Sequence, residues 1–294
     1  MKRTTPTERI GEARPWERGW WKPSAGNLWV LIHLVAIHSL ALVGLVLFPV
    51  PGGKVFLAAL AATMAGGVGT TVCYHRYLAH KTLRMNRVLE QILIFCAVAN
   101  GSEAPLSWAA NHRAHHSNAD TTDDVSSPRY GGFWWAHLRW LYQWPAGSVQ
   151  RWCKDLDHPR YWIWSYLQIP VILLSLLAGG LMGWKALFWI GPIRLVYSLH
   201  MQCFVNSLLH LPAKRLPEGA DSSRNIWWLG PLQLTAWGEN LHKNHHAVPR
   251  AARFSRAWYQ IDVGWYTICL LRTLGLVSDV YSSGRSGPPV PPVE

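Results

Sequence analysis

Four long apolar runs alternate with polar, aromatic-rich segments along the chain. A transmembrane helix needs about 20 consecutive apolar residues, and runs of about that length cover residues 28–48, 55–73, 161–182 and 186–209. A shorter apolar stretch at 88–99 cannot cross a bilayer and predicts a re-entrant or interfacial helix. The pattern therefore predicts an all-α integral membrane protein with four transmembrane helices.

The polar segments divide the rest of the chain into an arm, a cap and a tail. Residues 1–27 are basic and contain several Trp, as is typical of an arm that ends at the membrane interface. One domain is expected over 28–281, with a helical cap built from 74–160 and 210–281. The Gly- and Pro-rich residues 282–294 predict a disordered tail.

The distribution of basic residues predicts the orientation of these segments. Of the 28 Lys and Arg residues, only Lys54, Lys185 and Arg194 lie outside the arm, the two cap segments and the C-terminal tail. The positive-inside rule therefore places both termini and the cap in the cytoplasm. The net charge of +12, together with the apolar runs, favours a bilayer as partner and not nucleic acid.

Histidine clusters in the cap carry the candidate chemistry. His112, His115 and His116 are spaced i, i+3 and i+4, so on an α-helix all three rings can leave one face. The same spacing returns at 242–246, and His75 and His80 lie upstream. Neutral imidazole is a good ligand for first-row transition metals, so the clusters predict a metal site on the cytoplasmic side.

The fourth apolar run contributes one more histidine. Ser198, Gln202, Asn206 and His210 follow one another at i, i+4, and such a polar stripe inside a span indicates a functional site. The candidate ligands are then His75, His80, His112, His115, His116, His210, His242, His245 and His246. Nine are too many for one ion, so two metals are expected.

One pair in this set poses a geometric problem. His75 and His80 are about 140° apart on an α-helix and cannot share a face. Either the helix ends between them or they serve different metals. His200 lies off the polar stripe, and neither it nor His33 and His38 is assigned a role as a ligand.

The motifs together resemble a known family. The segments 74–80, 112–116 and 238–246 are similar to the three histidine boxes of the membrane fatty acyl desaturases, with the closest similarity to the acyl-CoA (stearoyl-type Δ9) branch. Asn206-Ser207 followed by His210 resembles the Asn-Ser-x-x-His of that branch. This resemblance implies that His210 is a ninth ligand and that Asn206 reaches a metal through water.

The resemblance also implies an activity. It implies two iron ions, dioxygen as co-substrate, and electrons from a separate donor protein, ferredoxin-like or cytochrome-b-type, with its reductase. The reaction would insert a cis double bond into a long acyl chain, as acyl-CoA and near the middle of the chain. No catalytic residue beyond the metal centre is expected.

Further residues are expected around that metal centre. Ligating imidazoles are oriented by outer carboxylates, for which the candidates are Asp120, Asp123, Asp124 and Glu239. Trp108 matches a family Trp that borders the acyl chain near its bend. Gln202-Cys203 stands where many acyl-CoA members carry Thr-Trp, and this difference concerns the substrate and not the metal ligands.

Alternatives remain at the level of the reaction and of the class of protein. The same dimetal scaffold could act as a hydroxylase or an acetylenase, or on an acyl chain carried by a glycerolipid or a carrier protein. A membrane metal transporter is a third reading. Transporters bind ions near the bilayer midplane, whereas these clusters lie outside the apolar runs. Their position therefore argues against the transporter hypothesis.

Overall fold

The computed structural model describes residues 14–145, 147–211, 216–217 and 220–282. The predicted tail therefore lies outside the described residues except for Ser282, as does the first half of the predicted arm. The described chain is mostly helical, as predicted. Its only strands are β1 (Arg84–Met85) and β2 (Val277–Ser278), which pair antiparallel.

Three helices in the described chain are long and apolar enough to cross a membrane. They are α1 (Leu28–Leu47), α2 (Gly53–Val68) continued by the π-helical η3 (Gly69–Ala79), and α8 (Pro159–Gly180). Their mean hydropathies are 2.5, 1.7 and 1.6. Because α1 and α8 keep most of their apolar side chains on the outside of the fold, these helices need an apolar environment. They correspond to the first three predicted spans.

The fourth predicted span is not one continuous helix. The segment consists of α9 (Trp184–Phe188), the π-helical η6 (Trp189–Ile193) and α10 (Arg194–Ser207). Gly191 interrupts the helix with φ −89° and ψ −111°, and Pro192 follows it. Pro has no backbone N–H and disfavours a helical conformation in the residue before it, which explains the break. The prediction of a single helix over 186–209 is therefore wrong, and a fourth crossing stays a prediction.

Arg194, the charged residue of this segment, is buried and has several hydrogen-bond partners. Its guanidinium donates to Oδ1 of Asn100 at 2.7 Å and to the carbonyl of Ala99 at 2.9 Å. Its Nε donates to the carbonyl of Ile190 at 2.6 Å. A charge inside an apolar helix layer is tolerated when such partners surround it, so Arg194 ties α10 to the C-terminal end of α3 (Arg87–Ala99).

The α3 helix corresponds to the short apolar stretch of the sequence. The Asn86 side chain caps it by accepting from the backbone N–H of Val88 at 2.8 Å. One face of α3, including Ile94, is buried in the main hydrophobic core together with residues of η3, while Ile92 on the other face is exposed. A helix of 13 residues with two different faces fits the predicted interfacial position.

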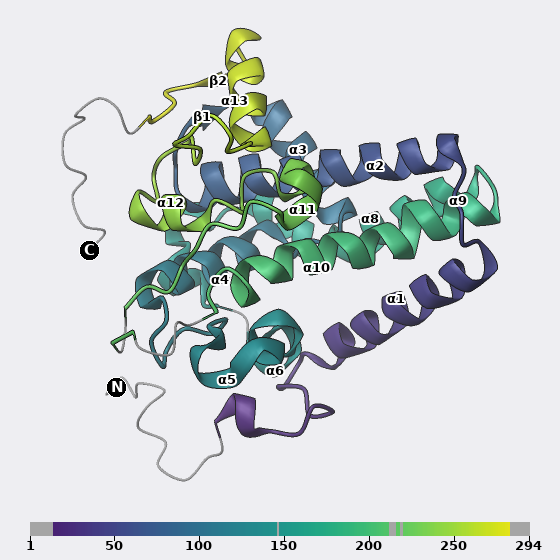
Figure 1. Ribbon diagram of the computed structural model, residues 1–294, viewed down its shortest axis with the longest axis horizontal. Coiled ribbons are helices and arrows are strands. Elements are labelled where there is room, and N and C mark those ends of the chain that lie inside the picture. Colours follow the sequence, from purple (N-terminus) through teal and green to yellow (C-terminus); the bar gives the residue numbers. More distant parts are fainter. Residues whose placement is uncertain (1–13, 146, 212–215, 218–219, 283–294) are drawn as a thin grey trace.

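The remaining helices are short, and all except η2, which lies in the N-terminal arm, belong to the predicted cap segments. They are η2 (Pro15–Glu17), α4 (Pro105–Asn118), α5 (Pro128–Trp134), η4 (Trp135–Arg139), α6 (Trp140–Gln143), α7 (Val149–Trp152), η5 (Lys154–Leu156), α11 (Leu229–Leu232), η7 (Leu234–Ala236), α12 (His242–Ala247) and α13 (Val263–Thr273). Figure 1 shows α4, α5, α6 and α12 gathered at the end of the long helices that lies opposite α9. The histidine clusters are therefore brought to one end of the molecule.

Candidate metal centre

The first histidine pair lies where a π-helix ends. The backbone N–H of His80 donates to the carbonyl of His75 at 3.1 Å, which is the i→i+5 bond of a π-helical turn. The helix ends at Ala79, so the first of the two geometric alternatives holds. The wider turn and this ending bring the two rings to a centroid distance of 5.1 Å. His75 and His80 therefore point to the same place, although α-helical geometry would separate them.

The second cluster, on α4, is divided between two places. The rings of His112 and His116 lie 4.6 Å apart, whereas His112 and His115 are 6.3 Å apart. His115 instead lies 4.7 Å from the ring of His210, which follows the end of α10. Of the three rings expected on one face, His112 and His116 lie together, whereas His115 turns towards a different set of partners.

The nine histidines form two groups. In each group the potential ligand atoms all lie within 4.8 Å of one another. The five-histidine group contains His75, His80, His112, His116 and His245. The four-histidine group contains His115, His210, His242 and His246. Each of the three predicted boxes contributes to this arrangement, and the second and third boxes contribute to both groups.

The spacing of the ring nitrogens suits metal ligation. The Nε2 atoms of His75 and His245 are 3.0 Å apart, and those of His116 and His245 are 2.9 Å apart. Two nitrogens bound to one metal at about 2.1 Å lie roughly 3 Å apart when they are neighbours in the coordination sphere. The five-histidine group therefore has the spacing of a shared cation.

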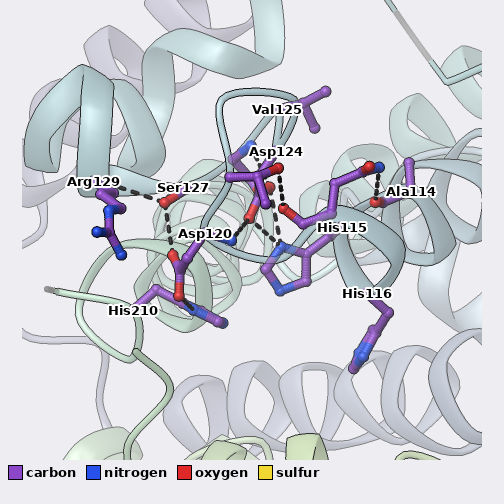
Figure 2. Close-up of polar contacts among 12 residues, drawn as sticks. Ala114, His115, His116, Asp120, Asp124, Val125, Ser127, Arg129 and His210 are labelled. Carbon is purple, nitrogen blue, oxygen red and sulfur yellow. Dashed lines mark hydrogen bonds and ion pairs between the residues drawn. The ribbon is translucent and has the colours of Figure 1, made fainter. Parts of the chain in front are cut away.

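Four carboxylates contact the outer ring nitrogens. Nδ1 of His75 lies 2.7 Å from Glu239, and Nδ1 of His115 lies 2.9 Å from Asp124. Nδ1 of His210 lies 3.1 Å from Asp120, and Nδ1 of His246 lies 3.1 Å from Asp221. Figure 2 shows Asp124 beside His115 and Asp120 beside His210, while His116 points away from both carboxylates. These contacts are the outer carboxylate–imidazole pairs typical of metal sites.

The carboxylates also fix which ring nitrogens carry protons. A carboxylate only accepts, so Nδ1 of His115 and of His246 must each donate. Their Nε2 atoms then carry lone pairs in the neutral rings, and these two atoms face each other at 3.4 Å. Two facing lone pairs repel each other unless a cation lies between them. The donor set therefore fits a metal ion on the inner side of the four-histidine group.

Burial and mutual repulsion keep most of the rings neutral. Burial first, and neighbouring histidines second, hold the pKa of His112, His116, His242 and His245 well below the ordinary value. The pKa of His246 is lowered to about 4, mainly by burial, against the opposing effect of Asp221. Burial also opposes protonation of His115, but contact with Asp124 outweighs it and raises that pKa. Neutral imidazole is the form that binds metals.

Of the four carboxylates predicted from the sequence, three contact a histidine. Asp123 lies in the same turn as Asp120 and Asp124, but its side chain contacts no histidine in the described part of the chain, and its Oδ1 is buried without a hydrogen-bond partner. Sequence reasoning missed Asp221, which contacts His246 and lies beside Asp120 and His210. Asp221 precedes an irregular segment with no periodic pattern. Its position shortly after His210 is therefore the only sequence feature that could have indicated a role beside the histidines.

Replacing Asp221 tests whether this missed carboxylate supports a metal ligand. We expect Asp221→Asn to lower metal affinity by about 10- to 100-fold, because loss of an outer partner weakens a ligating imidazole by that amount. Competition with a chelator followed by metal analysis measures the change. Asp123→Asn is the matched control, since Asp123 lacks a histidine contact, and its affinity should stay at the wild-type value. Equal losses in both variants would contradict the role of Asp221.

An apolar cavity of about 140 Å³ reaches the metal centre. It lies between η3, α4 and α10, and His75, His112 and His115 form part of its wall. The three residues predicted to border the acyl chain, Trp108, Gln202 and Cys203, all line it, as does Asn206.

Two contacts hold the wall of this cavity. The ring of Trp108 stacks on His112 with centroids 4.8 Å apart. The Ser102 hydroxyl donates to Gln202 at 3.1 Å. By contrast, His200, which had no assigned role, contacts His38 and His137 and belongs to neither metal group.

Comparison with known proteins identifies the family in which this arrangement of histidines and carboxylates occurs. The family model described as "Fatty acid desaturase" matches residues 53–262. Delta-9 acyl-lipid desaturase 1 of Arabidopsis thaliana is 34% identical, with 90% of this chain and 86% of the relative covered. The sn-1 stearoyl-lipid 9-desaturase of a Synechocystis strain is 32% identical, covering 88% of this chain and 82% of the relative. The sn-2 palmitoyl-lipid 9-desaturase of a Nostoc strain is 32% identical over 76% of this chain and 79% of the relative.

The matched residues contain both histidine groups and all four carboxylates that contact them. The match spans more than half of the chain, and the relatives are matched over most of their length. The chain therefore belongs to the fatty acid desaturase family and is an oxidoreductase that acts as a fatty acyl desaturase.

Proposed function

We propose that the two histidine groups each hold one iron and that the protein inserts a cis double bond into a long acyl chain in a dioxygen-dependent reaction. The single observation that carries this proposal is the position of both groups beside one apolar cavity. When bound, the irons would supply the dioxygen activation needed to break unactivated C–H bonds. The overall reaction removes two hydrogens from the chain, consumes dioxygen, two electrons and two protons, and forms two waters.

The five- and four-histidine groups support two ions that differ in the number of histidine ligands. First-row metals take four to six ligands, so each group is sufficient for one ion. We assign Asn206 to the smaller group, as a ligand through water, because it lies on the cavity wall together with His115. Glu239, Asp124, Asp120 and Asp221 would hold their imidazoles with Nε2 directed at the metals.

The chain's own residues would hold the substrate and exclude water. The acyl chain lies in the apolar cavity, where Trp108 fixes its position against the ring of His112. The Ser102–Gln202 hydrogen bond ties α10 to the segment before α4 and limits the width of the cavity. Orientation of one methylene pair against the metals is the protein's contribution to a cofactor-driven reaction.

The substrate we propose is a lipid-linked acyl chain, desaturated at the Δ9 position. This differs from the acyl-CoA expected from the sequence resemblance. It is supported by the relatives, whose names describe 9-desaturases acting on acyl-lipid, stearoyl-lipid or palmitoyl-lipid. Acyl-CoA and carrier-protein thioesters are the alternatives that product analysis must separate.

The proposed topology retains four crossings, with α9, η6 and α10 as the fourth. It places the cap, the metal centre and both termini in the cytoplasm, because the basic residues gather there. Electrons would come from a separate ferredoxin-like or cytochrome-b-type protein, which approaches the cap from the cytoplasm.

Expression in a host with a compatible reductase, followed by mapping of double bonds in the host lipids, tests the function. We expect new Δ9 monounsaturated chains that first appear in intact glycerolipids. A product that gains oxygen would indicate a hydroxylase, and a triple bond would indicate an acetylenase. Unchanged lipids combined with metal uptake would favour a transporter and contradict the proposal. An inactive variant, His242→Ala, serves as the background control.

A further inference from the structure

A second cavity of about 450 Å³ adjoins the one at the metal centre. The two cavities share part of their walls, so they lie directly beside each other. The shared residues are Gly101, Glu103, Asn111, Trp140, Leu141 and Leu199. A chain in the second cavity therefore lies next to the cavity that Trp108 and the histidines line.

The second cavity opens between two of the apolar helices. Its wall includes Trp29 and Ile32 of α1 and Ile169 of α8. These same side chains are 72%, 44% and 68% exposed, which places them at the outer rim of the cavity. We call these three residues the lateral opening. Because α1 and α8 are apolar enough to cross a membrane, the lateral opening faces the bilayer and not water.

Contacts at both ends of α1 leave this opening in place. Near the C-terminal end of α1, Gly44 lies so close to Phe188 that an added Cβ would be 2.8 Å from its ring. At the other end, the Asn27 side chain donates to the carbonyl of Trp144 at 2.7 Å. The cavity separates α1 from α8 between these two contacts. Asn27 and Trp144 also line this cavity, at the end where α1 begins.

The wall of the second cavity carries little charge. Among the described residues, no Lys or Arg lines the second cavity. Its one carboxylate, Glu103, accepts from Ser107 at 2.6 Å and from Asn111 at 3.0 Å, and both bonds reach the same oxygen, Oε2. The phosphates of coenzyme A would therefore find no cationic partner inside this cavity. Its lining suits the apolar part of a lipid.

We propose that the acyl chain of a membrane glycerolipid enters sideways from the bilayer through the lateral opening and extends past Glu103 to the metal centre. The headgroup stays at the membrane surface near Asn27 and Trp144. This inference rests on the proposed function, because it supplies that acyl desaturase with its substrate. It adds the route by which that acyl chain reaches the metal centre.

Photocrosslinking tests the route without requiring turnover. Full-length protein is reconstituted in vesicles of dioleoyl phosphatidylcholine that contain a trace of phosphatidylcholine with a diazirine on its saturated chain. After irradiation, mass spectrometry maps the labelled peptides. We expect labels on Ile32, on Ile172 of the same cavity wall, and on the α4 peptide that contains Trp108. Excess stearoyl-CoA should not compete with this labelling.

A matched pair of variants on α8 tests the opening itself. Ile169→Trp fills the lateral opening and should reduce labelling of the Trp108 peptide several-fold. Leu173→Trp places the same bulk on α8 at an exposed residue that lines neither cavity, so labelling should persist. Unchanged iron content in both variants shows that the fold is intact.

Two outcomes would overturn the route. One is labelling of the Trp108 peptide that is insensitive to Ile169→Trp, and the other is labelling displaced by stearoyl-CoA. Either result in a protein that desaturates lipids in cells refutes the lateral route and leaves the proposed function standing. Labelling through the opening in a protein that forms no double bond refutes the proposed function and leaves lipid entry standing.

Discussion

Replacing His115 or His116 with Ala will abolish desaturation, and each replacement will remove a different metal. The two residues are adjacent in the sequence, yet His115 belongs to the four-histidine group and His116 to the five-histidine group. We expect each variant to retain about one tightly bound iron per chain where the wild type holds about two, because each replacement removes a ligand from a different group and weakens metal binding in that group alone. Metal analysis of purified protein and product analysis in the host measure the two effects.

The controls separate metal loss from misfolding. His158→Ala changes an exposed histidine that caps α8 and lies in neither group, so its iron content and activity should equal those of the wild type. The double variant should lose both irons but still insert into membranes, because both residues lie in the cap. An active, purified wild-type protein with one metal or none would contradict the two-iron assignment, as would two irons in either single variant.

The sequence was sufficient to predict which residues gather, because metal-ligand chemistry can be read from residue type and spacing. All nine predicted histidines lie in the two groups. The partition between groups could not be predicted, because it depends on backbone geometry that hydrophobic patterns do not encode. The π-helical end of η3 brings His75 and His80 together, and the course of the chain between distant boxes pairs His75 with His245.

The same limit explains the other differences. Hydropathy describes the composition of 186–209 but not the break at Gly191, so the segment was expected to be one helix. Asp221 lies in a segment without regular structure, where spacing carries no positional information. The second cavity is formed by α1, α6 and α8, which are distant in sequence, and their apolar residues are equally typical of a packed bundle. Only the three-dimensional arrangement distinguishes a cavity wall from a core.

A buried ion pair joins the first histidine box to the segment that follows the third. Nη2 of Arg76 lies 2.7 Å from Oδ1 of Asp262, and both side chains are fully buried. Asp262 also accepts from the backbone N–H of Phe254 at 2.7 Å, and the Phe254 ring packs against His245 at 4.6 Å. Gly238 and Gly264 leave the necessary space, since an added Cβ would come within 2.3 Å of Asp262 and 2.2 Å of Arg76, respectively. The pair therefore positions His245 opposite His75.

Removing this carboxylate will destabilise the protein more than any surface change. Asp262→Ala leaves the Arg76 charge buried without a partner, which costs about 3–5 kcal/mol and should lower Tm by roughly 10 °C in a domain of this size. Iron should be lost first from the five-histidine group, because His245 loses its support. Asp262→Asn retains an acceptor for the Phe254 N–H, so its Tm should lie between those of the wild type and Asp262→Ala.

Arg84→Ala is the matched control, since its ion pair with Asp279 is exposed and contributes at most about 1 kcal/mol. A thermal unfolding series in one detergent compares the four proteins, and an unchanged Tm for Asp262→Ala would show that the buried pair does not hold the third box in place.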